Sequence, residues 1–164
     1  WPWRHIWKAK ILYKVSCFVW LLAKEVVLTQ ENVMKRGITL CSRCGKTAET
    51  VNHLFIQCKV TGELWNLFLR LKNISWSMPG RISEALYSWE EAGTQAKNRS
   101  NWRIVPATIW WKIWKERNLR VFENRESSMQ QVKLNCIFFL RKVTCIINKE
   151  YIRSILVILT SKSC

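Results

Sequence analysis

The sequence predicts a mainly α-helical protein, built as a small helical domain around one metal-binding cluster and followed by a further helical region. Two observations predict this fold class. Apolar residues recur at helical spacing in most of the longer segments of the 164-residue chain, and 49% of its residues are hydrophobic, which is enough for a core. Four side chains of the kinds that bind metal ions also lie close together in the sequence, at Cys41, Cys44, His53 and Cys58.

The first segment, from Ile6 to Leu28, is predicted to form one amphipathic helix. Its apolar residues recur at helical spacing, at Ile11, Val15, Phe18, Trp20 and Leu22. A short helix is expected next, with Thr29 as its N-cap and Gly37 just beyond its last turn. We expect the long first helix to pack on the metal-binding segment that follows.

The metal-binding segment has the spacing C-x2-C-x8-H-x4-C. Two cysteines separated by two residues can point at one ion from a tight turn, and Gly45 can supply the positive φ that such a turn needs. Thr50 is a candidate N-cap for a short helix that carries His53, and Cys58 would lie about one turn farther along. Three thiolates and one imidazole form the ligand set of a closed structural zinc site. The alternative is a reduced, metal-free cysteine cluster.

Charged residues beside the ligands have two interpretations each. Arg43, Lys46 and Lys59 could offset the negative charge of zinc-bound thiolates, or they could contact phosphate. Glu49 could accept the free ring N–H of His53, or it could lie in solvent at the start of the helix.

Further helices are expected on both sides of a break at residues 75–80. Residues 60–71 repeat a helical pattern, and another helix is expected over residues 83–91. The second long helix spans residues 102–122 and would begin near Pro106. The predicted buried positions of these two long patterns are Leu64, Trp65, Phe68 and Leu71, then Ile109, Trp110, Ile113, Trp114 and Phe122.

The C-terminal part is expected to hold one more helix. Ser127 or Ser128 could cap it, and it would run to about Lys149. We therefore divide the chain into a zinc-binding domain over residues 3–72, a linker with a short helix over 73–100, a Trp-rich basic helical region over 101–149, and a tail over 150–164 that is a candidate for disorder.

The charge of the chain indicates a polyanionic partner. Lys and Arg number 27 against 11 acidic residues, a formal net charge of +16. Such an excess favours nucleic acid first and an anionic membrane surface second, although basic charge can also serve solubility alone. The candidate nucleic-acid contacts are Arg43, Lys46, Lys59, Lys112, Lys115, Arg117 and Arg120.

Tryptophan is abundant, with 11 residues in the chain. Trp102, Trp110, Trp111 and Trp114 lie among the basic residues of the second long helix, a composition that suits base stacking. The alternative, which we favour for these residues, is an ordinary amphipathic helix with tryptophans in the core and a solvated basic face.

The residue composition leads us to exclude several classes of function. The chain has no Asp and only five Gly, so it lacks the carboxylates of two-metal phosphoryl transfer and any glycine-rich phosphate loop. We expect no enzymatic activity and no small-molecule substrate.

Seven cysteines without a dense framework favour a reducing, intracellular compartment, nucleus or cytoplasm. We expect neither a signal peptide nor a membrane span. We therefore expect neither secretion nor a membrane partner.

Residues that flank the metal ligands carry a family resemblance. They run in the order Ile6-Trp7-Lys8, Lys14-Val15, Phe18, Trp20, Leu28-Thr29, Arg36-Gly37, Glu49, His53-Leu54-Phe55 and Trp65. With the ligands, this set resembles the zinc-binding domain found C-terminal to the reverse transcriptase of plant LINE-type (non-LTR) retrotransposons. The resemblance covers residues 3–69, and residues 109–122 are similar to the Trp-rich stretch that often follows that domain. The family usually has proline where this chain has Leu12, which we expect to change the start of the helix and not the metal site.

The resemblance implies an accessory domain present without its polymerase, since the catalytic Asp residues of a polymerase are absent. It implies a role in holding template RNA or target DNA beside a polymerase, so nucleic acid and a polymerase domain are the expected partners. Two alternatives stay open: a structural or protein-interaction zinc module, and a non-functional retroelement remnant.

Overall fold

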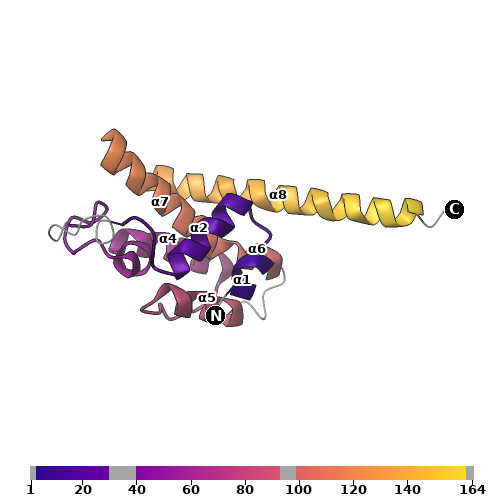
Figure 1. The fold of residues 1–164 in the computed structure, drawn as a ribbon, viewed down its shortest axis with the longest axis horizontal. Helices are drawn as coiled ribbons and strands as arrows, with labels where there is room; N and C mark the ends of the chain where they lie inside the picture. The colour runs from indigo at the N-terminus through magenta and orange to yellow at the C-terminus, as the bar shows by residue number, and fades with distance from the viewer. Residues whose placement is uncertain (1–2, 30–39, 93–98, 162–164) are drawn as a thin grey trace.

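The computed structural model describes residues 3–29, 40–92 and 99–161, and the fold is mainly α-helical, as predicted (Figure 1). Within these ranges no strand forms, and Leu40 and Ala48 make only an isolated antiparallel bridge. None of the described helices is both long and apolar enough to pass through a bilayer. The helices are α1 (Trp3–Lys8), α2 (Tyr13–Ala23), η1 (His53–Gln57), α4 (Lys59–Lys72), α5 (Ile82–Ala92), α6 (Arg99–Arg103), α7 (Val105–Glu123) and α8 (Met129–Ser161).

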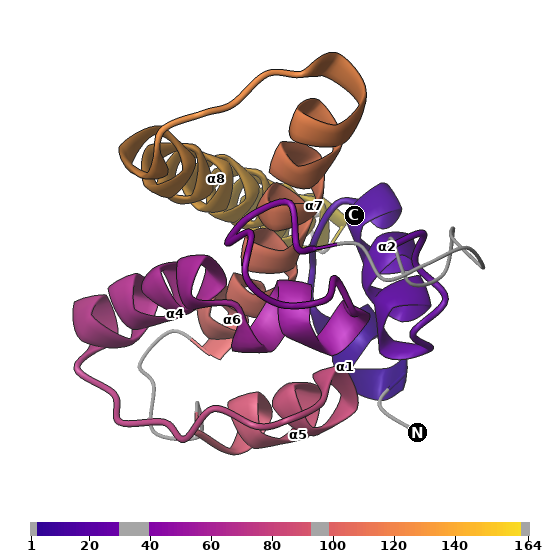
Figure 2. The ribbon, with the colours of Figure 1, turned by 90° about the vertical axis from the view of Figure 1, so that its left-hand side faces the viewer.

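Helix α7 lies at the centre of the arrangement. It contacts α2, η1, α4, α6 and α8, and Figure 2 shows it rising between α2 and α4. The segment 124–128 connects α7 to α8, which runs out as a long rod past the other helices (Figure 1). The Trp-rich region and the metal-binding segment therefore share one packed body.

The expected single helix over residues 6–28 is wrong, because the chain breaks between α1 and α2. Leu12 has φ −52° and ψ 132°, and its carbonyl accepts the N–H groups of Val15 and Ser16 at 2.8 and 3.1 Å. This φ is close to the value that proline would impose, so the backbone takes a proline-like conformation with leucine in place. The break lets α1 pack on both α2 and α5, which a continuous helix could not do.

One carbonyl joins three helices in the core. The carbonyl oxygen of Phe55 in η1 accepts the indole N–H of Trp65 from α4 at 3.3 Å and that of Trp110 from α7 at 3.2 Å. Phe55 and both tryptophans are fully buried. This shared acceptor satisfies both buried indole donors and fixes α4 and α7 against the helix that carries His53.

Most of the described tryptophans belong to the core, as predicted. Trp89 and Trp102 stack with ring centroids 3.9 Å apart, and each indole N–H donates to the other residue's carbonyl at 2.9 and 2.8 Å. Trp102 of α6 and Trp110 of α7 are buried, while Trp111 and Trp114 of α7 are partly buried against the same core. The base-stacking alternative therefore loses its main candidates.

Two apolar residues expected in the core lie on the surface. Leu71 is 62% exposed and Phe122 is 75% exposed. Each falls in the last turn of its helix, where Asn73 and Asn124 take left-handed conformations (φ 52° and 50°) that end α4 and α7. The helical spacing of apolar residues continues to the end of each helix, but the neighbouring elements that would bury these residues do not extend that far.

Several helix boundaries agree with the sequence and one does not. Helix α7 begins at Val105, next to Pro106, and the hydroxyl of Ser128 accepts the N–H of Gln131 at 3.2 Å at the start of α8. Helix α8 continues through Ser161, past its expected end near Lys149. The short helix expected between Thr29 and Gly37 lies outside the described residues.

Candidate metal centre

The two first cysteines lie on a tight turn, as their spacing predicts. Gly45 has φ +64°, a conformation open to glycine, and its N–H donates to the carbonyl of Cys41 at 2.8 Å. The N–H of Cys41 donates in turn to the carbonyl of Thr47 at 2.7 Å. These bonds close the turn and leave Cys41 and Cys44 on its inner side, toward His53.

His53 and Cys58 are brought together by a widened helical turn. The hydroxyl of Thr50 accepts the N–H of His53 at 3.0 Å, so the expected N-cap is confirmed. The N–H of Cys58 then donates to the carbonyl of His53 at 2.7 Å, a bond across five residues that defines η1 as a π-helix. In an α-helix two residues five apart lie about 140° apart around the axis, whereas the wider turn returns Cys58 toward His53.

The four side chains converge on one point. Their ligand atoms all lie within 4.8 Å of one another, and Sγ of Cys44 is 3.3 Å from Nε2 of His53. A zinc tetrahedron with Zn–S bonds of about 2.3 Å separates its sulfurs by about 3.8 Å. The donor set and its spacing therefore fit zinc after a contraction of about 1 Å at the widest pair.

The two buried cysteines, Cys41 and Cys58, share a hydrogen bond that shifts their pKa values in opposite directions. The hydrogen bond from Cys41 lowers the pKa of Cys58 to about 5, helped by the N–H groups of Val60 and Thr61 at the start of α4. The same hydrogen bond, with burial, raises the pKa of Cys41. Cys58 is therefore the more acidic thiol of the pair, and a bound cation would replace the protons of both sulfurs.

Arg43 lies inside the protein and not on a phosphate-binding surface. Its guanidinium is buried, 3.4 Å from Oε1 of Glu116 and close enough to Cys41 and Cys58 to interact with their charge. Burial lowers the pKa of Arg43, and the neighbouring carboxylate opposes that shift. The charge-offsetting interpretation of Arg43 therefore agrees with the structure, and the phosphate-contacting one does not.

Glu49 and Arg117 form a buried ion pair that links the metal-binding turn to α7. Oε1 of Glu49 accepts from Nε and Nη2 of Arg117 at 3.0 Å each. Oε2 accepts from the N–H and hydroxyl of Ser42 at 3.1 and 2.9 Å. Glu49 is therefore not solvated, and Arg117 is removed from the expected phosphate contacts because it cannot reach the surface.

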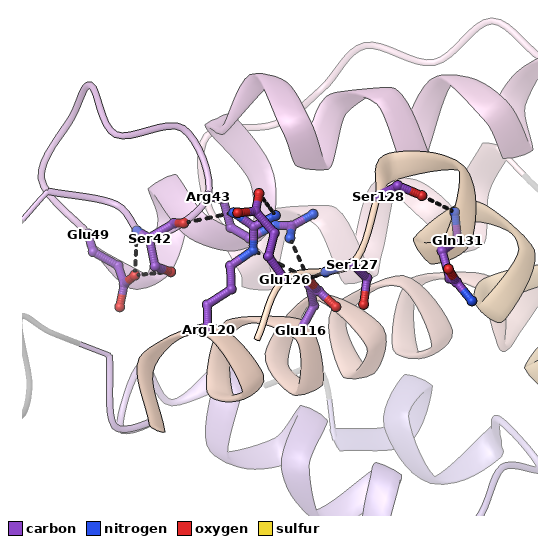
Figure 3. Close-up of polar contacts among 9 residues, drawn as sticks. All are labelled: Ser42, Arg43, Glu49, Glu116, Arg120, Glu126, Ser127, Ser128 and Gln131. Atoms are coloured by element: carbon purple, nitrogen blue, oxygen red, sulfur yellow. Dashed lines mark hydrogen bonds and ion pairs between the residues drawn. The ribbon is translucent and has the colours of Figure 1, made fainter. Parts of the chain in front are cut away.

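Arg120 completes this network on its outer side (Figure 3). It donates to the carbonyl of Ser42 at 3.3 Å and pairs with Glu116 at 3.3 Å and Glu126 at 2.8 Å. Glu116 was not singled out from the sequence. It is the only acid between Glu91 and Glu123, and a lone carboxylate in so basic a stretch was the available signal.

The remaining basic candidates stay accessible. Lys46, Lys59 and Lys115 are exposed, and Lys112 is partly buried with Nζ 4.9 Å from the ring centre of Phe139. The structure thus separates the seven candidates into arginines that tie the turn to α7 and lysines that are exposed or, at Lys112, partly buried.

Comparison with known proteins covers both halves of the chain. The family described as zinc-binding in reverse transcriptase matches residues 1–65, a range that holds all four ligands and ends at Trp65 in α4. A putative ribonuclease H protein of Arabidopsis thaliana is 23% identical over 134 residues, which is 78% of this chain and 21% of that protein. The chain thus spans about a fifth of that relative's length, and no solved structure matches it significantly. Residues 1–65 of the chain are therefore similar to the zinc-binding domains of reverse transcriptases.

Proposed function

We propose that the chain is a zinc-stabilised accessory module that binds nucleic acid and performs no catalysis itself. The observation that carries this proposal is the division of charge between interior and surface. Inside, Arg43 and Arg117 are matched by Glu116 and Glu49. The excess positive charge therefore lies outside, where phosphates can reach it.

The exposed side chains in the described ranges show this imbalance. The exposed acids are Glu25, Glu63, Glu84, Glu91, Glu123 and Glu126. The exposed cations are more numerous: Lys8, Lys10, Lys14, Lys24, Lys46, Lys59, Lys115, Lys142, Arg4, Arg70, Arg81, Arg125 and Arg141. Lysine is a flexible point charge, so contacts of this kind follow a phosphate backbone without reading its sequence.

Zinc would have a structural role in this module. Cys41, Cys44 and Cys58 would bind it as thiolates and His53 through Nε2, the ring nitrogen that faces Cys44. Four protein ligands leave no open position, so bound zinc would supply folding energy and no activated water. The similarity to zinc-binding domains of reverse transcriptases and to a putative ribonuclease H protein supports an association with nucleic-acid enzymes.

Binding should weaken steeply as salt rises. About four phosphate contacts on a single strand predict a slope of about −2.8 in log K against log salt, or a loss of about 50-fold between 50 and 200 mM. Fluorescence anisotropy with a labelled single-stranded RNA of mixed sequence measures this slope. A flat response, or no binding at 50 mM salt, would count against the proposal.

A protein-interaction role is the second candidate, favoured by apolar side chains on the projecting helix α8. Leu134 and Phe138 are 53% and 62% exposed there, near Ile137 on the same face. Such a patch fits a partner helix or the rest of a polymerase. Absence of RNA binding together with self-association that Phe138→Glu abolishes would favour this role.

A further inference from the structure

We propose that a cleft between α7 and α8 binds a single backbone phosphate of a nucleic acid. This inference rests on the proposed function and specifies where the strand is held. The cleft has a volume of about 120 Å³ and is lined by Lys112, Lys115 and Glu116 of α7, Ser127 of the connection, and Asn135 of α8. None of these residues belongs to the metal centre.

The geometry of α7 places its two lysines together. Positions 112, 115, 116 and 119 recur at helical spacing, so Lys112 and Lys115 share the face of α7 that turns toward α8. Nζ of Lys112 lies 4.9 Å from the ring centre of Phe139 on α8, a cation–π contact that restrains this side chain between the two helices. Lys112 and Lys115 thus line the α7 side of the cleft, and Asn135 lines its α8 side.

Among the described residues, the ammonium groups of Lys112 and Lys115 have no counterion. Neither lysine forms an ion pair or a side-chain hydrogen bond within the described part of the chain. Burial lowers the pKa of Lys112; Cys136 opposes this shift, and the neighbouring charge of Lys115 adds to it. An anion in the cleft would relieve this repulsion and replace the water that Lys112 has lost.

Glu116, the acid at the cleft, does not supply that counterion. Its Oε1 accepts the N–H of Ser127 at 2.9 Å and pairs with Arg43 and Arg120 (Figure 3). Burial opposes its ionisation, but these partners lower the pKa of Glu116, so it is a carboxylate already matched by two guanidinium groups. Cys136, which lies next to Asn135 on α8, stays a neutral thiol, since burial raises its pKa to about 12.

The size of the cleft selects the ligand. A volume of about 120 Å³ is well below the about 300–1,000 Å³ of pockets for drug-sized ligands. A space of this size suits one phosphate group better than a whole nucleotide. The ligand class is therefore a phosphodiester of a strand whose bases remain outside.

The test compares two variants with the same loss of charge. Lys112→Gln/Lys115→Gln should weaken binding of the labelled RNA at least about 10-fold at 100 mM salt and flatten the salt slope by about 1. Lys10→Gln/Lys14→Gln, at exposed positions in the break after α1 and in α2, should weaken it by less than about 3-fold. Circular dichroism establishes that both variants fold, and Lys115→Gln alone, at an exposed site, provides a milder substitution.

Equal losses in the two double variants would overturn the cleft while leaving nucleic-acid binding intact. If the unmodified chain binds no RNA, the proposed function fails. Titration with inorganic phosphate then tests separately whether the cleft binds a phosphate group. Chemical-shift changes confined to Lys112, Lys115 and Asn135 would support it. Absent or dispersed changes would overturn it.

Discussion

Replacing Cys58 with serine is expected to abolish stoichiometric zinc binding and to unfold the domain. Cys58 is fully buried, and it both ends η1 and precedes α4, so the loss of its thiolate affects two elements at once. Structural zinc contributes binding free energy on the order of 10 kcal/mol, comparable to the whole net stability of a typical domain. Bound zinc per chain after dialysis, and thermal unfolding followed by circular dichroism, measure the two effects.

Cys145→Ser is the matched control. Cys145 is an exposed cysteine on α8, outside the metal-binding cluster, so its loss should leave zinc content and the unfolding midpoint unchanged. A Cys58→Ser protein that keeps one zinc per chain, or that melts within a few degrees of the unmodified chain, would show that this sulfur is not a ligand.

Breaking the buried pair of Glu49 and Arg117 should have the next largest effect. Glu49→Leu leaves the guanidinium of Arg117 buried without its carboxylate, which costs about 3–5 kcal/mol in comparable pairs. The double variant Glu49→Leu/Arg117→Met removes both charges and should recover much of that loss. Urea unfolding of the zinc-loaded proteins gives the three free energies of a double-mutant cycle.

An exposed pair provides the comparison. Lys133 and Glu63 pair at 2.9 Å between α8 and α4 on the surface, and Glu63→Gln should cost less than about 1 kcal/mol. If Glu49→Leu costs no more than Glu63→Gln, the buried network does not hold α7 to the metal-binding turn.

The metal centre could be predicted from the sequence because its parts are local. A CxxC turn with glycine after it, and a threonine three residues before a histidine, each specify their own backbone geometry. The widened turn of η1 could not be predicted, since residue spacing alone does not separate α from π closure over His53–Gln57.

The roles of the arginines could not be predicted for a different reason. Arg117 and Glu49 lie 68 residues apart, so their pairing depends on how α7 packs on the metal-binding turn. In a basic stretch, an arginine that pairs inside the protein has the same neighbours in sequence as one that faces solvent. Lys115 and Arg117 are two residues apart, yet the first is exposed and the second is buried.

The break between α1 and α2 also depends on contacts between residues far apart in the sequence. Apolar residues keep a helical period through Ile11, and only the packing of α1 on α5 requires the chain to turn at Ala9 to Leu12. Long-range packing therefore decided this break, while local sequence decided where most of the helices begin.

The most direct measurement is zinc K-edge X-ray absorption on the purified, zinc-loaded chain. One zinc ion held by Cys41, Cys44, Cys58 and His53 predicts three sulfur neighbours at about 2.3 Å and one nitrogen neighbour at about 2.0 Å. A first shell of mainly oxygen neighbours, or of fewer than three sulfurs, would contradict a metal centre built from these four side chains.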